Sequence, residues 1–173
     1  MNNDIITEVG KYKKGWTGGL PETPCGYGSK LDQTVIQREW IPRMVEKYNI
    51  KTVADIGAGD LNWVREMDWP YPVQYEAFDL VPRDPSVKQL DLIHEVPPKR
   101  DLLLCLWLLN HLPVDHAKAA QDNLFKSGSE YLMVTWWDEM DDYLDLPAIE
   151  EVKIRTRHKL DRRIEFWLRL VKC

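Results

Sequence analysis

Residues 53–60, with the sequence Val-Ala-Asp-Ile-Gly-Ala-Gly-Asp, constrain the fold more than any other part of the chain. An apolar strand is followed directly by two alternating glycines, which permit a tight turn and let a ligand approach the bare backbone. A second apolar segment ends in Asp79, 24 positions after Asp55. Ligands of open α/β sheets bind at the carboxyl ends of the strands. These two strand ends therefore predict a site for a nucleoside-containing ligand.

The order of apolar segments predicts a largely parallel sheet with helical crossovers. A helix is expected over residues 32–48, with Pro42 kinking or splitting it, a short helix near Leu61, and another helix over residues 113–125. The segment 101–106 is apolar on both faces, as a central parallel strand should be. The five strands expected in this part of the chain are residues 52–56, 73–79, 87–90, 101–106 and 130–136.

The C-terminal segment has a different pattern. Apolar residues alternate with polar ones from Val152 to His158 and again from Ile164 to Leu170, with a turn-like gap at residues 159–162. This predicts an antiparallel hairpin at the edge of the sheet. The whole chain is interpreted as one α/β domain, a Rossmann-like three-layer sandwich of about seven strands. Its parts are an arm or lid (1–30), a ligand-binding core (31–136), an acidic loop (137–150) and the hairpin (151–173).

Composition excludes several classes of protein. The net charge of -5 disfavours non-specific binding to nucleic acid. The longest apolar run, residues 102–109, is too short to span a membrane, and residues 1–4 lack the layout of a signal peptide. Cys25, Cys105 and Cys173 form neither a disulfide framework nor a metal-binding pattern. We therefore expect a cytoplasmic protein with no metal and no membrane partner.

The glycine turn lacks one feature of dinucleotide-binding proteins. Their fingerprint has a third glycine three residues after the second, which allows close packing of the following helix and a pyrophosphate cradle. Asn62 occupies that position here. A cofactor without a pyrophosphate tolerates this change, so a dehydrogenase is a distant alternative.

With these features the chain resembles the class I S-adenosylmethionine (SAM)-dependent methyltransferases, and more narrowly a group of small bacterial and phage members of unassigned substrate. The residues that carry the resemblance are Asp55-Ile56-Gly57-Ala58-Gly59 after the first strand, Asp79 after the second, Asp91 after the third, and the apolar fourth strand. The resemblance implies SAM as the cofactor. The cofactor-binding positions that it implies are Asp55, Gly57, Ala58, Gly59, Asp60, Asp79, Leu80, Asp91, Leu92, Leu106, Gly28 and Ser29.

Each of these positions also has a plainer interpretation. The two glycines could form a simple strand-to-helix turn, and Asp79 could cap a helix rather than accept hydrogen bonds from ribose hydroxyls. Asp91 could face the adenine, as the resemblance implies, or close a turn. Asp55 is expected to order the glycine loop and to face the sulfonium end, where its negative charge favours a cationic cofactor.

His111 is the candidate general base. It lies just past the fourth strand, and an imidazole there could take a proton near neutral pH; alternatively it packs beneath the cofactor or caps the next helix. Asn110 is not part of the Asn-Pro-Pro-Tyr motif of amino-group DNA methyltransferases. The Pro24-Cys25 pair lies before the sheet, unlike the catalytic Pro-Cys of cytosine methyltransferases. These absences argue against methylation of DNA bases.

Two segments could hold a methyl acceptor. The first is the arm, with Gly-Trp-Thr-Gly-Gly at residues 15–19 and Gly28-Ser29, which could fold over the cofactor or be a flexible terminus. The second is the acidic and aromatic segment 136–143, which could receive a cationic or amine-bearing acceptor or be a solvated loop. The basic residues of the C-terminal hairpin could face RNA, but they more simply protect a sheet edge from aggregation.

The sequence therefore predicts a SAM-dependent methyltransferase that acts on a small-molecule or sugar-like acceptor. Two alternatives remain: a SAM-binding protein without transferase activity, and an enzyme that cleaves SAM. The identity of the acceptor and the oligomeric state are not determined by the sequence.

Overall fold

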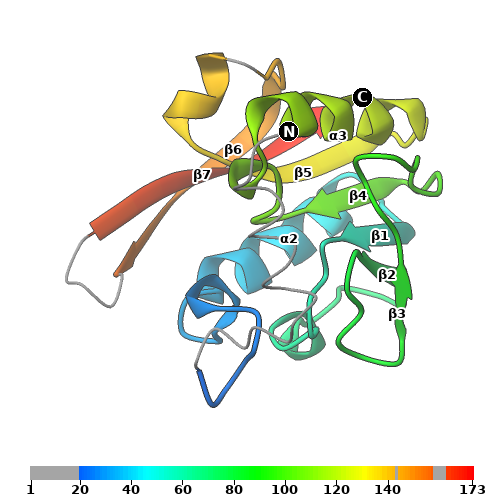
Figure 1. Ribbon diagram of the computed structural model, residues 1–173. Coiled ribbons are helices and arrows are strands. Elements are labelled where there is room, and N and C mark those ends of the chain that lie inside the picture. Colours follow the sequence, from blue (N-terminus) through cyan, green and yellow to red (C-terminus); the bar gives the residue numbers. More distant parts are fainter. Residues whose placement is uncertain (1–19, 143, 158–162) are drawn as a thin grey trace.

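The protein is described here from a computed structural model, which places residues 20–142, 144–157 and 163–173. Its core is one seven-stranded sheet with the strand order β3-β2-β1-β4-β5-β7-β6 (Figure 1). The strands are β1 (Thr52–Ile56), β2 (Gln74–Asp79), β3 (Val87–Gln89), β4 (Leu102–Cys105), β5 (Tyr131–Trp136), β6 (Ala148–Arg157) and β7 (Arg163–Lys172). The five strands predicted before the hairpin are all present, with bounds that differ by one residue or none.

The first five strands are parallel, and β1 lies between β2 and β4. All four residues of β4 are buried, as are all six of β5, because a parallel sheet is covered on both faces. In the register of β1, Asp55 lies opposite Ala77 of β2 and Leu104 of β4. The carboxyl ends of β1, β2 and β4 therefore lie together at one edge of the sheet.

Two α-helices cover opposite faces of the sheet and complete three layers (Figure 1). Helix α2 (Val35–Lys47) buries Ile41 and Val45 against Leu102 and Leu104. Helix α3 (Val114–Lys126) packs on the other face, against the alternate residues of β4. The two apolar clusters thus follow the two-residue period of the strands. The fold is the predicted Rossmann-like α/β sandwich.

Of the two alternatives predicted for Pro42, splitting of the helix is excluded, because Pro42 lies inside the continuous helix α2. A proline in a helix removes one backbone hydrogen bond, and the burial of Ile41, Met44 and Val45 on both sides of Pro42 holds the helix together. The short helix expected near Leu61 is a single 3-10 turn, η2 (Val64–Glu66).

The predicted C-terminal hairpin is present. β7 pairs antiparallel with β5 on one side and with β6 on the other, which leaves β6 at the edge of the sheet. β6 begins at Ala148, a few residues before the expected start. Lys153 pairs with Glu165 at 2.6 Å and Arg169 with Glu151 at 3.1 Å, so basic side chains here are neutralised across the hairpin. The expected turn at residues 159–162 lies outside the described residues.

Candidate functional site

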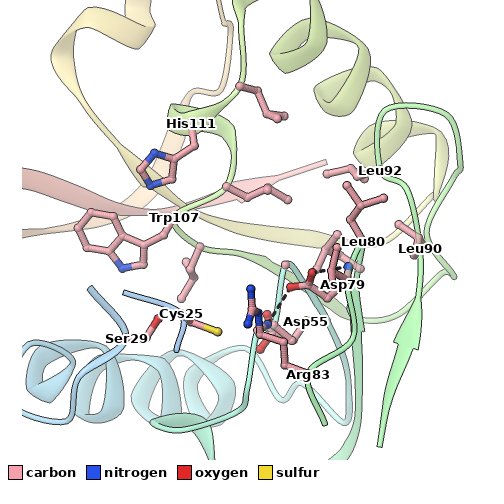
Figure 2. A pocket seen from close by; sticks show the side chains of 18 of the residues that line it. Cys25, Ser29, Asp55, Asp79, Leu80, Arg83, Leu90, Leu92, Trp107 and His111 are labelled. Atoms are coloured by element: carbon pink, nitrogen blue, oxygen red, sulfur yellow. Dashed lines mark hydrogen bonds between the residues drawn. The ribbon is translucent and has the colours of Figure 1, made fainter. Parts of the chain in front are cut away.

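A cavity of about 200 Å³ opens at the carboxyl ends of β1, β2 and β4. Figure 2 shows it from close by. This is the edge at which ligands of open α/β sheets bind. The residues that line it are Cys25, Ser29, Asp55, Ile56, Gly57, Ala58, Gly59, Trp63, Asp79, Leu80, Val81, Arg83, Leu90, Asp91, Leu92, Ile93, Leu106, Trp107, Leu108, His111 and Leu112.

The turn after β1 requires its two glycines. Gly57 has φ +82° and Gly59 has φ +63°, a region that residues with a side chain rarely adopt. A Cβ on Gly57 would lie 3.2 Å from the Leu108 side chain, and one on Gly59 would lie 2.7 Å from Sγ of Cys25. The backbone itself therefore forms this wall of the cavity.

Asp79 connects the end of β2 to this turn. One oxygen, Oδ2, accepts a hydrogen bond from the backbone N–H of Gly59 at 2.9 Å, and Oδ1 accepts one from Val81 at 2.9 Å. The N–H groups of Gly57 and Ala58 donate to the carbonyl oxygen of Phe78, next to Asp79. We call Gly57, Ala58, Gly59 and Asp79 the turn end of the cavity. The glycine turn and Asp79, which lies 20 positions after Gly59, thus form one hydrogen-bonded unit.

Asp55 lies beneath the turn and is only 4 % exposed. Its Oδ2 accepts a hydrogen bond of 2.6 Å from the hydroxyl of Tyr75. Burial raises the pKa of Asp55 to about 7, the Tyr75 hydroxyl opposes this shift, and the negative charge of Asp79 adds to it. Burial and the neighbouring Asp55 also raise the pKa of Tyr75. The hydrogen bonds that order the glycine turn go to Phe78 and Asp79, whereas Asp55 bonds to Tyr75.

Asp91 follows β3 and closes a turn with its own side chain. Its Oδ1 accepts a hydrogen bond of 3.1 Å from the N–H of Ile93, and its own N–H donates to Oε1 of Glu95 at 2.8 Å. Asp91 also lines the cavity beside Leu90 and Leu92. Asp91 therefore closes a turn, as one interpretation of the sequence predicted, and it lines the cavity, while its contact with adenine stays a prediction.

The opposite end of the cavity is formed by the segment that follows β4. Trp107 has φ +58°, which costs a bulky residue about 1–3 kcal/mol. Its N–H donates to Oγ1 of the buried Thr135 at 2.8 Å. Its ring meets Phe166 edge to face, with centroids 4.3 Å apart. We call Trp107, Leu108, His111 and Leu112 the aromatic end of the cavity.

His111, the predicted base, lies in η3 (Leu109–His111) and is exposed at this end. Figure 2 shows the Trp107 indole between His111 on one side and Ser29 and Cys25 on the other. In the same view Asp79, Leu80, Leu90 and Leu92 lie on the far side of the cavity. His111 is thus separated from the carboxylates and close to an aromatic ring.

The described part of the arm contributes to the cavity through Cys25 and Ser29. Burial, together with the charge of Asp60, raises the pKa of the Cys25 thiol to about 12, so it is a neutral side chain at physiological pH. Gly28 lies outside the lining, and a Cβ at this position would lie 3.5 Å from the Trp107 ring. Asp60 also lies outside it and accepts a hydrogen bond from the N–H of Asn62. Residues 15–19 of the arm lie outside the described residues.

The acidic segment after β5 does not line the cavity. Trp136 is fully buried, and its Nε1 donates to Asp141 at 2.9 Å. Asp138, in η4 (Asp138–Asp142), accepts a hydrogen bond of 3.2 Å from Trp167. Arg169 also pairs with Asp141. These carboxylates bind the C-terminal strands, and the expectation that they receive a cationic acceptor gains no support from their positions.

Several lining residues had not been predicted from the sequence. Arg83 and Trp107 line the cavity, and Tyr75 orients Asp55 from outside it. Trp107 follows an apolar strand and could have been suspected from its position alone. Tyr75 sits within a strand, where its side chain has no distinguishing sequence pattern.

The part of the chain that the structure describes contains no cluster of three or more His, Cys, Asp or Glu residues suited to a metal ion. Its helices are also too short or too polar to cross a membrane.

Solved structures of methyltransferases share this architecture. The methyltransferase domain of bacterial CtHen1 has a TM-score of 0.59 and 13% identity, covering 83% of this chain and 100% of that chain. Magnesium protoporphyrin IX methyltransferase (ChlM) from Synechocystis PCC 6803 with bound SAM has a TM-score of 0.60 and 15% identity, covering 98% and 94%. The mitomycin 7-O-methyltransferase MmcR has a TM-score of 0.58 and 10% identity, covering 81% and 54%. The chain therefore has the class I methyltransferase fold.

No protein-family model matches the chain, and no curated protein matches it significantly in sequence.

Proposed function

We propose that the protein is a SAM-dependent methyltransferase that acts on a small-molecule acceptor, a class that includes sugar-like compounds. The observation that carries the proposal is the turn end: bare backbone at Gly57 and Gly59, tied to the Asp79 carboxylate at the carboxyl ends of β1 and β2. A nucleoside fits such a wall because the backbone leaves room that a side chain would fill. The methyltransferase structures of the same fold, one of them with bound SAM, support this assignment.

The residues around the cavity fit SAM in distinct ways. Asp79 has lone pairs beyond those used by Gly59 and Val81, so it can accept hydrogen bonds from ribose hydroxyls. Leu80 and Leu92 offer apolar surface for the adenine, with Asp91 at its edge. Asp55 places a carboxylate with no cationic partner in the described hydrogen bonds and ion pairs at the base of the cavity. The positive charge of a bound cationic ligand would provide the partner that the Asp55 carboxylate lacks.

The position of the missing third glycine also fits a cofactor without a pyrophosphate. Asn62 donates from Nδ2 to the carbonyl oxygen of Ser29 at 2.9 Å and to Oε1 of Glu22 at 3.1 Å. Its side chain therefore holds the arm against the glycine turn. A long helix, whose N-terminus binds the pyrophosphate of dinucleotides, does not follow; only the 3-10 turn η2 does. Asn62 thus favours an arm that closes over the cofactor.

When bound, SAM supplies an activated methyl group on a sulfonium, so the protein needs mainly to align the acceptor and exclude water. The apolar side chains of Leu106, Leu108 and Leu112 exclude water on the side of β4. Ser29 and Cys25 cover the cavity from the arm. His111 would take the proton of a hydroxyl acceptor, since it lies at the exposed side where an acceptor enters.

The test uses SAM with an isotope-labelled methyl group. The protein is incubated with it and with mixtures of hydroxyl, amine and sugar compounds, and the products are identified by mass spectrometry. The proposal predicts a labelled methyl group on one class of acceptor and stoichiometric S-adenosylhomocysteine (SAH). Breakdown of SAM in the absence of any acceptor would instead support cleavage, and failure of a folded sample to bind SAM or SAH would overturn the assignment.

A further inference from the structure

Trp107 holds an unfavourable backbone conformation at the wall of the cavity. Its φ of +58° is unusual for a bulky side chain, and outliers of this kind cluster at functional sites. Its backbone N–H donates to Thr135, its ring packs edge to face with Phe166, and a Cβ at Gly28 would lie 3.5 Å from the ring. The surrounding structure thus fixes this conformation and keeps the indole at the cavity wall.

The indole N–H of Trp107 is buried and has no hydrogen-bond partner among the described residues. Buried indole N–H groups are normally paired, because leaving a donor unpaired costs stability. The neighbouring Trp137, with ring centroids 6.1 Å away, carries a second buried and unpaired N–H, but only Trp107 lines the cavity. The indole N–H of Trp107 is therefore a hydrogen-bond donor at the aromatic end that could bind a polar atom of the methyl acceptor.

Charge at the aromatic end excludes two classes of acceptor. Of the described residues that line the cavity, the carboxylates are Asp55, Asp79 and Asp91, and Arg83 is the guanidinium. Figure 2 shows Asp79 and Arg83 on the other side of the cavity from His111 and Trp107. The other residues of the aromatic end are Leu108 and Leu112, and the apolar Leu106 also lines the cavity. A cationic or strongly anionic acceptor would find no complementary charge there.

We propose that the methyl acceptor is an uncharged aromatic hydroxyl compound, carrying a second hydrogen-bond-accepting atom that binds the indole N–H of Trp107. The aromatic body of such a compound suits the leucine walls and the rings of Trp107 and His111. Its second polar atom accepts a hydrogen bond from the indole N–H of Trp107, which has no partner among the described residues. Trp107 is thus a residue that selects the acceptor. The inference rests on the proposed function, because it names the substrate class of the same site.

A phenolic hydroxyl also matches the available base. Phenols ionise near a pKa of about 10, far more readily than aliphatic alcohols, so a positioned imidazole removes the proton of a phenol more easily than that of an aliphatic alcohol. In the transfer, the phenol oxygen forms its bond to the methyl carbon while the carbon–sulfur bond breaks. The electron pair of that bond passes to sulfur, which leaves as the thioether of SAH, and the phenol proton passes to His111. No oxidant or further reactant is needed.

The test measures binding of three probes by ligand-observed NMR titration, each with and without SAH. The probes are 2,6-dihydroxynaphthalene, its saturated analogue decahydronaphthalene-2,6-diol, and naphthalene, which lacks oxygen. The wild type should bind the aromatic diol about tenfold more tightly than the saturated diol, because only the aromatic diol can make ring contacts with Trp107 and His111. Trp107→Phe keeps a ring but removes the N–H, so it should weaken the aromatic diol about tenfold and leave naphthalene unchanged.

Trp137→Phe is the matched control, since it also removes a buried unpaired N–H but from a ring outside the cavity lining. It should bind the aromatic diol like the wild type. Equal binding of the aromatic and saturated diols, or equal loss in the two variants, would overturn the inference. If SAH binds normally in those cases, the proposed function stands without it. If the aromatic diol binds through Trp107 while SAM and SAH do not bind, the site for an aromatic ligand stands, but the proposed function fails and the ligand is not a methyl acceptor.

Discussion

The two ends of the cavity are built by different means. The turn end consists of backbone: two glycines with positive φ and N–H groups that bond to Asp79 and to the Phe78 carbonyl oxygen. The aromatic end consists of side chains on a strained segment, with Trp107 supported by Thr135 and Phe166 from the C-terminal half of the chain. A backbone-built end binds a part common to many ligands, whereas an end built from side chains can be specific for one acceptor class.

The largest effect on ligand affinity is expected from Gly59→Ala, which places a side chain in the backbone turn of the turn end. The new Cβ would lie 2.7 Å from Sγ of Cys25 at a φ of +63°, so the turn must move away from Asp79. We expect affinity for SAH to fall about 100-fold or more by calorimetry, since the hydrogen bond to Asp79 and the cavity wall are lost together.

Gly128→Ala is the control for Gly59→Ala. Gly128 has nearly the same φ, +67°, but a Cβ there would lie 4.0 Å from the nearest side-chain atom, far from the cavity lining. Both variants should lose about 1–2 kcal/mol of stability from backbone strain. Only Gly59→Ala should also lose affinity for SAH. Equal affinity in the two variants would show that the turn end is only a structural turn.

The buried Asp55 predicts that stability depends on pH. Its pKa is about 7 in the folded protein, against 3.8 for an unperturbed aspartate, so between these values the folded state holds a proton that the unfolded state has released. The free energy of unfolding should therefore fall as pH rises from about 4 to about 7, by on the order of a few kcal/mol.

Asp55→Asn should remove the decrease in the free energy of unfolding between about pH 4 and about pH 7. Urea titrations at a series of pH values would measure it. Tyr75→Phe removes the hydrogen bond that opposes the shift, so it should extend the fall to higher pH. If the stability of Asp55→Asn and of the wild type depended on pH in the same way, the raised pKa of the buried Asp55 would be contradicted.

Asp79→Ala tests the ribose assignment at the turn end. Loss of one carboxylate that binds two hydroxyls should weaken SAH about tenfold by calorimetry. Asp84→Ala is the control, because Asp84 also accepts hydrogen bonds beyond β2, from Ser86, but does not line the cavity. An Asp79→Ala protein that binds SAH as tightly as Asp84→Ala would remove the assignment.

His111→Gln should show the smallest effect on the cofactor. His111 lies at the aromatic end (Figure 2), so SAH affinity should stay within about twofold of the wild type while methyl transfer to a hydroxyl acceptor falls about 100-fold. The labelled-methyl assay measures the second quantity. Full transfer activity would limit His111 to a structural role.

The same contrast explains what the sequence could predict. The strands and the hairpin follow from local apolar periodicity, and the turn end follows from glycines and an aspartate placed directly after strands. The sequence could not decide whether Pro42 splits its helix, because the outcome depends on tertiary packing of Ile41 and Val45, which outweighs one lost hydrogen bond. The sequence left the role of segment 136–143 open, because Asp138 and Asp141 bond to Trp136, Trp167 and Arg169, partners that only the folded chain brings near.

The conformation of Trp107 was equally inaccessible, because positive φ in a tryptophan has no local sequence signal. It depends on Thr135 and Phe166, which are distant in the chain. The Asp55–Tyr75 hydrogen bond depends in the same way on the register of β1 and β2.

Calorimetric titration of the wild-type protein with SAM tests the central claim most directly. The turn end predicts saturable binding of one SAM per chain, weakened about tenfold by Asp79→Ala and unchanged by Asp84→Ala. Absence of binding in a folded sample would contradict the claim, as would equal affinities in all three proteins.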